Sequence, residues 1–392
     1  MKKKFRHIPI ELLDPPFTSP LVGLVIDLDY LRRKRLGGTA SEETFYQLKS
    51  IFHTLESIGS ARIEGNRTEI AEVIEAKIKT SASKNEAILE ILNMENALAF
   101  IDKNIGGNKR KIDKAFLLEL HKMVVDGLTP PPNGEGSRRP GKFRNTPVSI
   151  TKSKVVNPHH LQVDEYMDSL LEYVNKEDPE KYDLLKIALA HHYFAWIHPF
   201  DNGNGRTVRL LTYAMLVRDG FRVDRGGRII NPTAIFCNNR EEYYDYLAIA
   251  DTGTTKGRTI WCEYVLSGLK REIEKLDKLM DHEYLLPKII LPSIDYVFQE
   301  KLITDTEAKI LKIAARKQVF QAGDVKEEFP KKSKQDISRI LRRLKEKKMI
   351  EPETGAKTKY VLRFVNNFLT RGIIDSLGKE DFLPKLPEKN KD

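Results

Sequence analysis

Residues 191–216 read HHYFAWIHPFDNGNGRTVRLLTYAML, and this stretch is the most informative part of the chain. A helical pattern runs into His198 and Pro199, and a new helix is predicted to start near Gly205. The residues from Asn202 to Gly205 have no bulky side chains, so successive backbone N–H groups can turn toward one point at a helix N-terminus. The stretch therefore predicts two helices joined by an anion-binding loop.

Three titratable or charged side chains flank this loop. Arg206 and Arg209 are three residues apart, so their guanidinium groups extend from the same helical turn and can grip phosphate oxygens. His198 lies just before the loop, where a neutral imidazole can take a proton from an incoming hydroxyl. Each feature alone also fits a structural histidine or an ordinary turn. In this order and spacing they predict a phosphoryl-transfer site.

The run from His198 to Arg209, HPFDNGNGRTVR, resembles the signature of the Fic family. Members are α-helical enzymes that mostly transfer AMP from ATP to a Ser, Thr or Tyr hydroxyl of a protein and release pyrophosphate. The resemblance implies that His198 is the general base and that Phe200 is a core anchor. It implies that ATP is the substrate and that Arg209 reaches the γ-phosphate. The other expected nucleotide-binding residues of the loop are Asn202, Gly203, Asn204, Gly205, Arg206, Thr207 and Val208.

One position departs from the family pattern. Where the family usually has Asp or Glu holding a magnesium ion, this chain has Asn202. An amide oxygen can coordinate Mg²⁺, but the lost negative charge should weaken binding, and the adjacent Asp201 could partly compensate. Both Mg²⁺ as a cofactor and Asn202 as its ligand are therefore open expectations.

The segment from Ser60 to Gly65, SARIEG, resembles the inhibitory motif of Fic proteins. The resemblance implies that Glu64 pairs with Arg209 and keeps it from the γ-phosphate, so that the enzyme is autoinhibited. In some relatives this glutamate also helps to remove AMP from the modified protein. The alternative is a surface glutamate at the end of a helix.

Two further segments resemble Fic elements. Gly141 to Arg144 is similar to a hairpin flap that aligns the target segment, with Val148, Ser149, Ile150 and Thr151 facing the nucleotide; an ordinary hairpin is the alternative. NREEYYDYLAIAD, residues 239–251, is similar to the segment that lines adenine and ribose. Its expected nucleotide-binding residues are Tyr243, Tyr244 and Asp251, although tyrosines at helical spacing also fit a core.

The composition is that of a globular protein with more than one domain. The chain has 392 residues, 40% hydrophobic and 31% charged, and a net charge of +10 that suits a polyanionic partner. Its two cysteines predict no disulfide framework and no structural zinc site. The basic N-terminus lacks the apolar run of a signal peptide, and no stretch is long enough to span a bilayer, so we expect a cytoplasmic protein without membrane contact.

Helical periodicity from Ser41 to about Met280 predicts a mainly α fold. We expect an N-terminal helical region at 1–105, a Fic-type helical core with a short β-hairpin flap at 106–285, a small α+β winged-helix domain at 286–370, and a disordered tail at 371–392. In the winged helix, Thr304 and Glu307 predict a capping box before a helix, and a second helix is expected from Ser333.

The second of these helices is basic. Residues 331–348 contain nine Lys or Arg against Asp336 and Glu346, which suits DNA binding through phosphate contacts. A solvated helix in a protein-interaction module, including a homodimer, is the alternative.

The leading interpretation is an autoinhibited protein adenylyltransferase that acts on a protein substrate, itself included. A nucleotide-sensing, DNA-binding regulator with a weak or inactive Fic site is one alternative, and transfer from another donor, such as CDP-choline, is a second.

Overall fold

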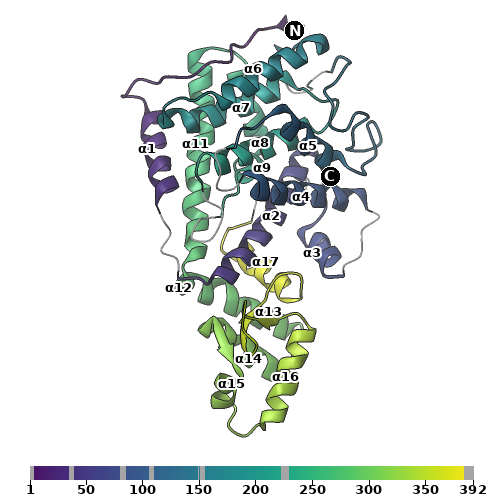
Figure 1. The fold of residues 1–392 in the computed structure, drawn as a ribbon, viewed down its shortest axis with the longest axis vertical. Helices are drawn as coiled ribbons and strands as arrows, with labels where there is room; N and C mark the ends of the chain where they lie inside the picture. The colour runs from purple at the N-terminus through teal and green to yellow at the C-terminus, as the bar shows by residue number, and fades with distance from the viewer. Residues whose placement is uncertain are drawn as a thin grey trace, which may run out of the picture.

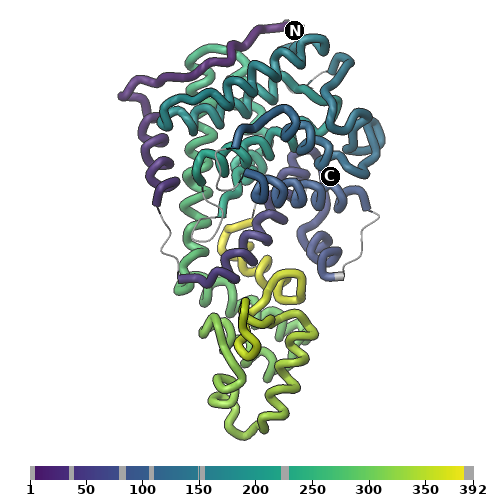
Figure 2. Tube along the Cα trace, in the orientation of Figure 1, coloured from purple at the N-terminus to yellow at the C-terminus, as the bar shows by residue number. Residues whose placement is uncertain are grey.

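The computed structural model describes residues 4–34, 39–79, 85–105, 110–148, 150, 155–221 and 229–383. It is mainly helical, as the sequence predicts, and Figures 1 and 2 show a large helical body above a smaller lobe. The body contains β1 (Lys4–Phe5), α1 (Pro20–Arg33), α2 (Glu42–Glu64), α3 (Ile70–Lys79), α4 (Glu86–Ile105), α5 (Lys114–Val125), β2 (Val155–Val156), α6 (Val163–Asn175), α7 (Asp183–Ile197), α8 (Asn204–Arg218), α9 (Thr233–Cys237), α10 (Arg240–Ala250) and α11 (Thr255–Asp277). Within the described part of the chain, no helix combines the length and apolar character needed to cross a membrane.

Helices α7 and α8 form the centre of the body. Nearly every side chain from Leu184 to Ile197 is buried, and the same holds from Thr207 to Val217. A helix that is apolar on all sides is stable only when other helices surround it. Here α4, α5, α6 and α11 pack around the pair. The loop between α7 and α8 is thereby held in the core of the body.

The smaller lobe contains α12 (His282–Leu285), α13 (Leu291–Gln299), α14 (Asp305–Lys317), β3 (Val319–Gln321), α15 (Ala322–Glu328), α16 (Lys334–Glu346), β4 (Ile350–Pro352), β5 (Lys359–Leu362) and α17 (Leu369–Lys379). Its strands form an antiparallel sheet in the order β3-β5-β4. The predicted capping box of Thr304 and Glu307 is confirmed at the start of α14, and Ser333 caps α16. Strand β3, between α14 and α15, was not predicted.

Helix α2 belongs to both parts of the molecule. Phe45, Leu48 and Phe52, in its first half, lie in the same hydrophobic core as the helices of the lobe. The Gln47 side chain donates to the Leu362 carbonyl over 2.9 Å and accepts from the Phe364 N–H over 2.7 Å. Figure 1 shows α2 running from the lobe into the body.

One expectation differs from the structure, and a second falls partly outside the described residues. The tail was expected to be disordered from residue 371, but α17 continues to Lys379 and buries Ile373 and Leu377 against α13, because its apolar residues recur at helical spacing. The expected flap hairpin lies partly outside the described residues, at 149 and 151–154, and residues 137–148 contain no strand. Strand β2 pairs in parallel with β1, from the N-terminal part of the sequence.

Candidate functional site

The loop between α7 and α8 turns sharply at both ends. His198 ends α7 in a left-handed conformation, with φ of 53°, and its N–H donates to the Phe194 carbonyl. Gly203 precedes α8 with φ of 76°, and a Cβ there would lie 3.1 Å from the Val125 side chain. Glycine is favoured at this position because it adopts positive φ without steric cost.

Side chains of the loop hold its shape. The Asn204 amide donates to the Phe200 carbonyl and accepts from the Phe200 N–H, both over 2.9 Å. The Thr207 hydroxyl donates to the Gly203 carbonyl over 2.8 Å. Phe200 is fully buried, which confirms it as a core anchor. Asn204 and Thr207 therefore stabilise the loop from within.

His121 contacts the loop from outside, and the sequence did not predict it as a site residue. Its ring stacks on Phe200 with centroids 3.7 Å apart. Nδ1 accepts from the Gly141 N–H over 3.0 Å, so Nε2 carries the proton and donates to the Asn202 carbonyl over 3.1 Å. Burial lowers the pKa of His121 to about 4, which keeps the ring neutral. No local pattern could have linked these positions, because they are distant in the sequence.

Arg144 joins the expected flap segment to the same loop. Its backbone N–H donates to the Pro199 carbonyl and its Nε donates to the His198 carbonyl, each over 2.8 Å. A further guanidinium nitrogen donates to the Pro158 carbonyl over 2.7 Å. The segment therefore lies against the loop, as expected for a flap.

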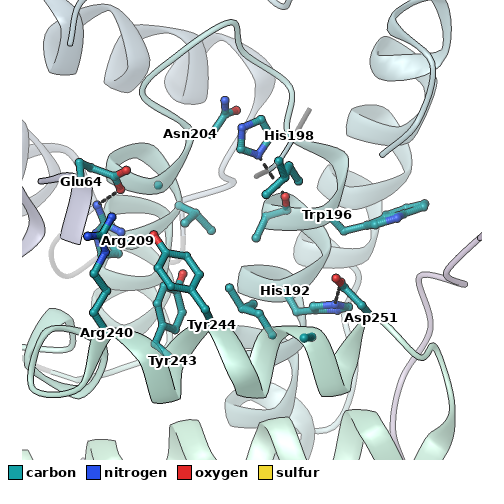
Figure 3. A pocket seen from close by; sticks show the side chains of 16 residues that line it. Glu64, His192, Trp196, His198, Asn204, Arg209, Arg240, Tyr243, Tyr244 and Asp251 are labelled. Carbon is teal, nitrogen blue, oxygen red and sulfur yellow. Dashed lines mark hydrogen bonds and ion pairs between the residues drawn. The ribbon is translucent and has the colours of Figure 1, made fainter. Parts of the chain in front are cut away.

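A cavity of about 470 Å³ lies beside the loop (Figure 3). Of the expected site residues, ten line it: Glu64, Ile150, His198, Asn204, Gly205, Val208, Arg209, Tyr243, Tyr244 and Asp251. The others that the structure describes, Val148, Asn202, Gly203, Arg206 and Thr207, do not line it. Ser149 and Thr151 lie outside the described residues.

One end of the cavity is charged. A guanidinium nitrogen of Arg209 lies 2.7 Å from Glu64 Oε1, and Arg209 also donates to the side chain and carbonyl of Ser60. Burial raises the pKa of the Glu64 carboxyl, but the charge of Arg209 outweighs that effect and lowers it. The structure therefore brings together the ion pair that the sequence predicts between Glu64 and Arg209, and Glu64 is ionised.

Arg206 is turned away from the cavity, in contrast to our expectation of a phosphate contact. It is fully buried, with one guanidinium nitrogen 3.0 Å from Glu90 Oε1 and another donating to the Glu135 carbonyl over 2.6 Å. Glu90 comes from α4, and neither partner is near Arg206 in the sequence. Arg206 therefore joins α8 to α4 in this structure.

The residues expected to hold magnesium do not fit that role as they are placed. The Asn202 amide nitrogen donates to the Gly136 carbonyl and to Glu135. Asp201, the expected compensating ligand, accepts from the Ser137 hydroxyl and from the Arg138 N–H. Both side chains are thus directed at the segment 135–138, and neither lines the cavity.

Trp196 lines the opposite end of the cavity, and α10 contributes Tyr243, Tyr244 and Leu247 to the wall (Figure 3). Tyr244 lies close to the charged end, where its ring faces the Arg240 guanidinium. Asp251 lies beyond them, 3.0 Å from His192 Nε2. Tyr243 is buried, and its hydroxyl lies 2.8 Å from His191 Nε2, so it supports the wall from within the core. Aromatic side chains next to a charged end suit a nucleotide.

His198 lies between the two ends (Figure 3). Its Nδ1 lies 3.3 Å from the Ala195 carbonyl, which suits a proton on Nδ1 and leaves Nε2 able to accept one. Burial lowers the pKa of His198 to about 4, so the imidazole is neutral near pH 7. Trp196, His192 and Arg240 also line the cavity and were not predicted as site residues.

Comparison with known proteins agrees with this geometry. Residues 111–216 match the model of the Fic/DOC family. The protein adenylyltransferase Fic of Culex quinquefasciatus is 30% identical over 222 residues, 55% of this chain and 38% of that protein. The corresponding protein of Nematostella vectensis is 28% identical over 218 residues, 55% of this chain and 45% of that protein. The chain thus spans less than half the length of these curated relatives.

Solved structures share the fold. A Fic family protein from Desulfovibrio desulfuricans G20 aligns with a TM-score of 0.53 at 19% identity, over 89% of this chain and 98% of that one. Fic-1 from C. elegans aligns with a TM-score of 0.51 at 22% identity, over 65% of this chain and 71% of that one. Residues 111–216 therefore match a Fic/DOC domain, and the chain shares its fold with solved Fic proteins.

Proposed function

We propose that this chain is a protein adenylyltransferase that uses ATP and is restrained by Glu64. The observation that carries the proposal is the ion pair between Glu64 and Arg209 in the cavity that also contains His198. The names of the similar proteins, protein adenylyltransferase Fic, support the same chemistry. The aromatic wall would receive the base, and the charged end would receive the phosphates.

The reaction assigns one role to each group. A Ser, Thr or Tyr hydroxyl of the target protein attacks the α-phosphorus of ATP, and His198 Nε2 takes the hydroxyl proton. The bond from the α-phosphorus to the oxygen bridging the β-phosphate breaks, so pyrophosphate leaves. Backbone N–H groups at the start of α8 stabilise the charge that develops on the phosphates.

Glu64 restrains the enzyme because its carboxylate pairs with the Arg209 guanidinium, which a phosphate would otherwise bind. The amide end of α8 and Arg209 form an anion site, and the Glu64 carboxylate already fills part of it. A γ-phosphate would have to displace this carboxylate. Substituting Glu64 with glycine removes the competing charge, and it should raise transfer.

The test is label transfer to protein from α-labelled against γ-labelled ATP, with wild type, Glu64→Gly and Glu64→Gly/His198→Ala. We expect label from the α position alone, rising in Glu64→Gly and lost when His198 is also changed. CDP-choline competition distinguishes another donor. If Glu64→Gly binds ATP and transfers no label from either position, the proposal is wrong.

A second candidate function is nucleotide sensing by a DNA-binding regulator, favoured by α16. Its exposed face carries Lys334, Arg339 and Arg342, and the order of helices and strands around it agrees with a winged helix. We expect duplex DNA to bind more weakly as salt rises, because basic side chains displace counterions from phosphates. Arg339→Glu/Arg342→Glu should abolish this binding in a mobility-shift titration. Unchanged DNA binding in that variant would exclude α16 as the contact surface.

A further inference from the structure

Arg240 lines the cavity, but it belongs neither to the loop between α7 and α8 nor to the ion pair of Glu64 and Arg209. It is the first residue of α10, it is exposed, and it lines the charged end of the cavity. Figure 3 shows its side chain rising beside Arg209 and toward Glu64. Its guanidinium lies over the Tyr244 ring, 5.6 Å from the centroid. Among the residues that the structure describes, no carboxylate forms an ion pair with Arg240.

The other two arginines near the cavity are already engaged. Arg206 is fully buried, does not line the cavity and is paired with Glu90. Arg209 lines the cavity, but Ser60 and Glu64 hold its guanidinium. When Glu64 leaves, Arg209 alone would face an ATP triphosphate with about four negative charges. Polyphosphate sites normally present more than one cation or guanidinium.

We propose that Arg240 is a phosphate-binding residue of this site and that it forms, with Arg209, the pair of guanidinium groups that grips the outer phosphates of ATP. The inference rests on the proposed function, because it assumes a nucleoside triphosphate in this cavity. It moves the second phosphate contact from Arg206, where the sequence placed it, to the N-terminus of α10.

Two observations make Arg240 suited to this task. Burial raises the pKa of the Glu64 carboxyl, and the charges of Arg209, Arg206 and Arg240 outweigh that effect, so the field of Arg240 reaches the position of Glu64. The Tyr244 ring beneath the guanidinium limits its rotamers without neutralising its charge. A guanidinium that is ordered in advance loses less entropy when it binds phosphate.

The alternative is that Arg240 only packs on Tyr244 and thereby supports the wall for the base. The two roles differ in the ligand that they affect. A phosphate contact matters for ATP and not for adenosine, whereas support of the wall matters for both. Adenosine therefore separates them.

The experiment measures dissociation constants of ATP and adenosine by calorimetry, using the full chain. The parent is Glu64→Gly, and the test variants add Arg240→Gln or Arg240→Lys. A matched control adds Arg110→Gln, which removes the same charge from an exposed position before α5. Thermal unfolding of each variant checks the fold.

We expect Arg240→Gln to weaken ATP about tenfold, the lower range for a charge-assisted contact at an exposed site, and to change adenosine by less than about twofold. Arg240→Lys should recover part of the loss because it keeps the charge without the planar fork. Arg110→Gln should match the parent.

Equal weakening of ATP and adenosine, or unchanged ATP binding in Arg240→Gln, overturns the inference. If the parent binds no ATP, the nucleotide site itself is wrong, and the inference is overturned with it. If the parent binds ATP and depends on Arg240 but transfers no α-label to protein, adenylyl transfer fails and the phosphate contact of Arg240 is supported.

Discussion

The chemistry of His198 is set by burial. Because its pKa is lowered to about 4, the imidazole can accept a proton throughout the neutral range. In Glu64→Gly, His198→Ala should lower transfer about 10²- to 10⁴-fold, the usual contribution of a general base, and leave ATP binding intact. Single-turnover transfer and calorimetry measure the two quantities. Full transfer without His198 would remove it from this role.

The pH dependence follows from the same residue. Because the pKa of His198 is lowered, its imidazole is protonated, and unable to act as a base, only at acidic pH. The fall of kcat/KM on the acidic side should therefore be centred well below pH 6.5, approaching about pH 4. Transfer by Glu64→Gly, measured between pH 4.5 and 8, checks this. A limb centred at 6.5 or higher would show that the ring is solvated during the reaction.

Which site residues the sequence could predict depends on where their partners lie. His198, Arg209 and Glu64 line one cavity, as expected from the two short motifs that contain them. Arg206 differs because its direction depends on Glu90 of α4 and on Glu135, which only the tertiary fold brings near. Arg240 had no motif of its own, since its role arises from its place beside Arg209.

Among the elements, the contact of α2 with α9 contains a buried titratable group. Glu56 of α2 accepts from the Thr233 N–H at the start of α9 over 3.0 Å, and burial raises the pKa of the Glu56 carboxyl to about 8. The folded protein therefore keeps a proton on Glu56 that the unfolded chain loses above about pH 4.5. The stability that this group contributes is fully present below about pH 4.5 and is lost as pH rises through about 8.

This predicts that stability declines between pH 5 and 8 through Glu56. In Glu56→Gln, which stays neutral, the free energy of unfolding should fall less steeply over this range. Denaturant titrations at several pH values measure the slope, with Glu43→Gln on the same helix as the matched control. Identical slopes in wild type and Glu56→Gln would show that the carboxyl is ionised in the fold.

The sequence predicted those structural elements correctly whose pattern lies within a few neighbouring residues. The capping box of Thr304 and Glu307 appears as predicted, because both halves of the motif lie within one helical turn. The pairing of β2 with Lys4–Phe5, in contrast, was not predicted. A strand partner more than a hundred residues away leaves no trace in the local pattern.

At the scale of the whole molecule, α2 connects the smaller lobe to Glu64, the proposed inhibitory residue. Its first half is part of the core of the lobe, and its last residue, Glu64, pairs with Arg209. From Gln47 to Glu64 the helix is about 26 Å long, at 1.5 Å per residue. Because one continuous helix serves both cores, the position of Glu64 depends on how firmly the lobe holds the start of α2.

Gln47→Ala tests this dependence. The change leaves the Leu362 carbonyl and the Phe364 N–H without their buried partner, which should cost about 1–3 kcal/mol of unfolding free energy. If about 1 kcal/mol of that loss reaches the pair of Glu64 and Arg209, transfer in an otherwise wild-type chain should rise about fivefold. Tyr46→Ala, an exposed neighbour on α2, is the control and should change neither quantity much. A Gln47→Ala protein that loses stability while transfer stays at the wild-type level would show that the two ends of α2 move independently, and the restraint would then be local to Ser60, Glu64 and Arg209.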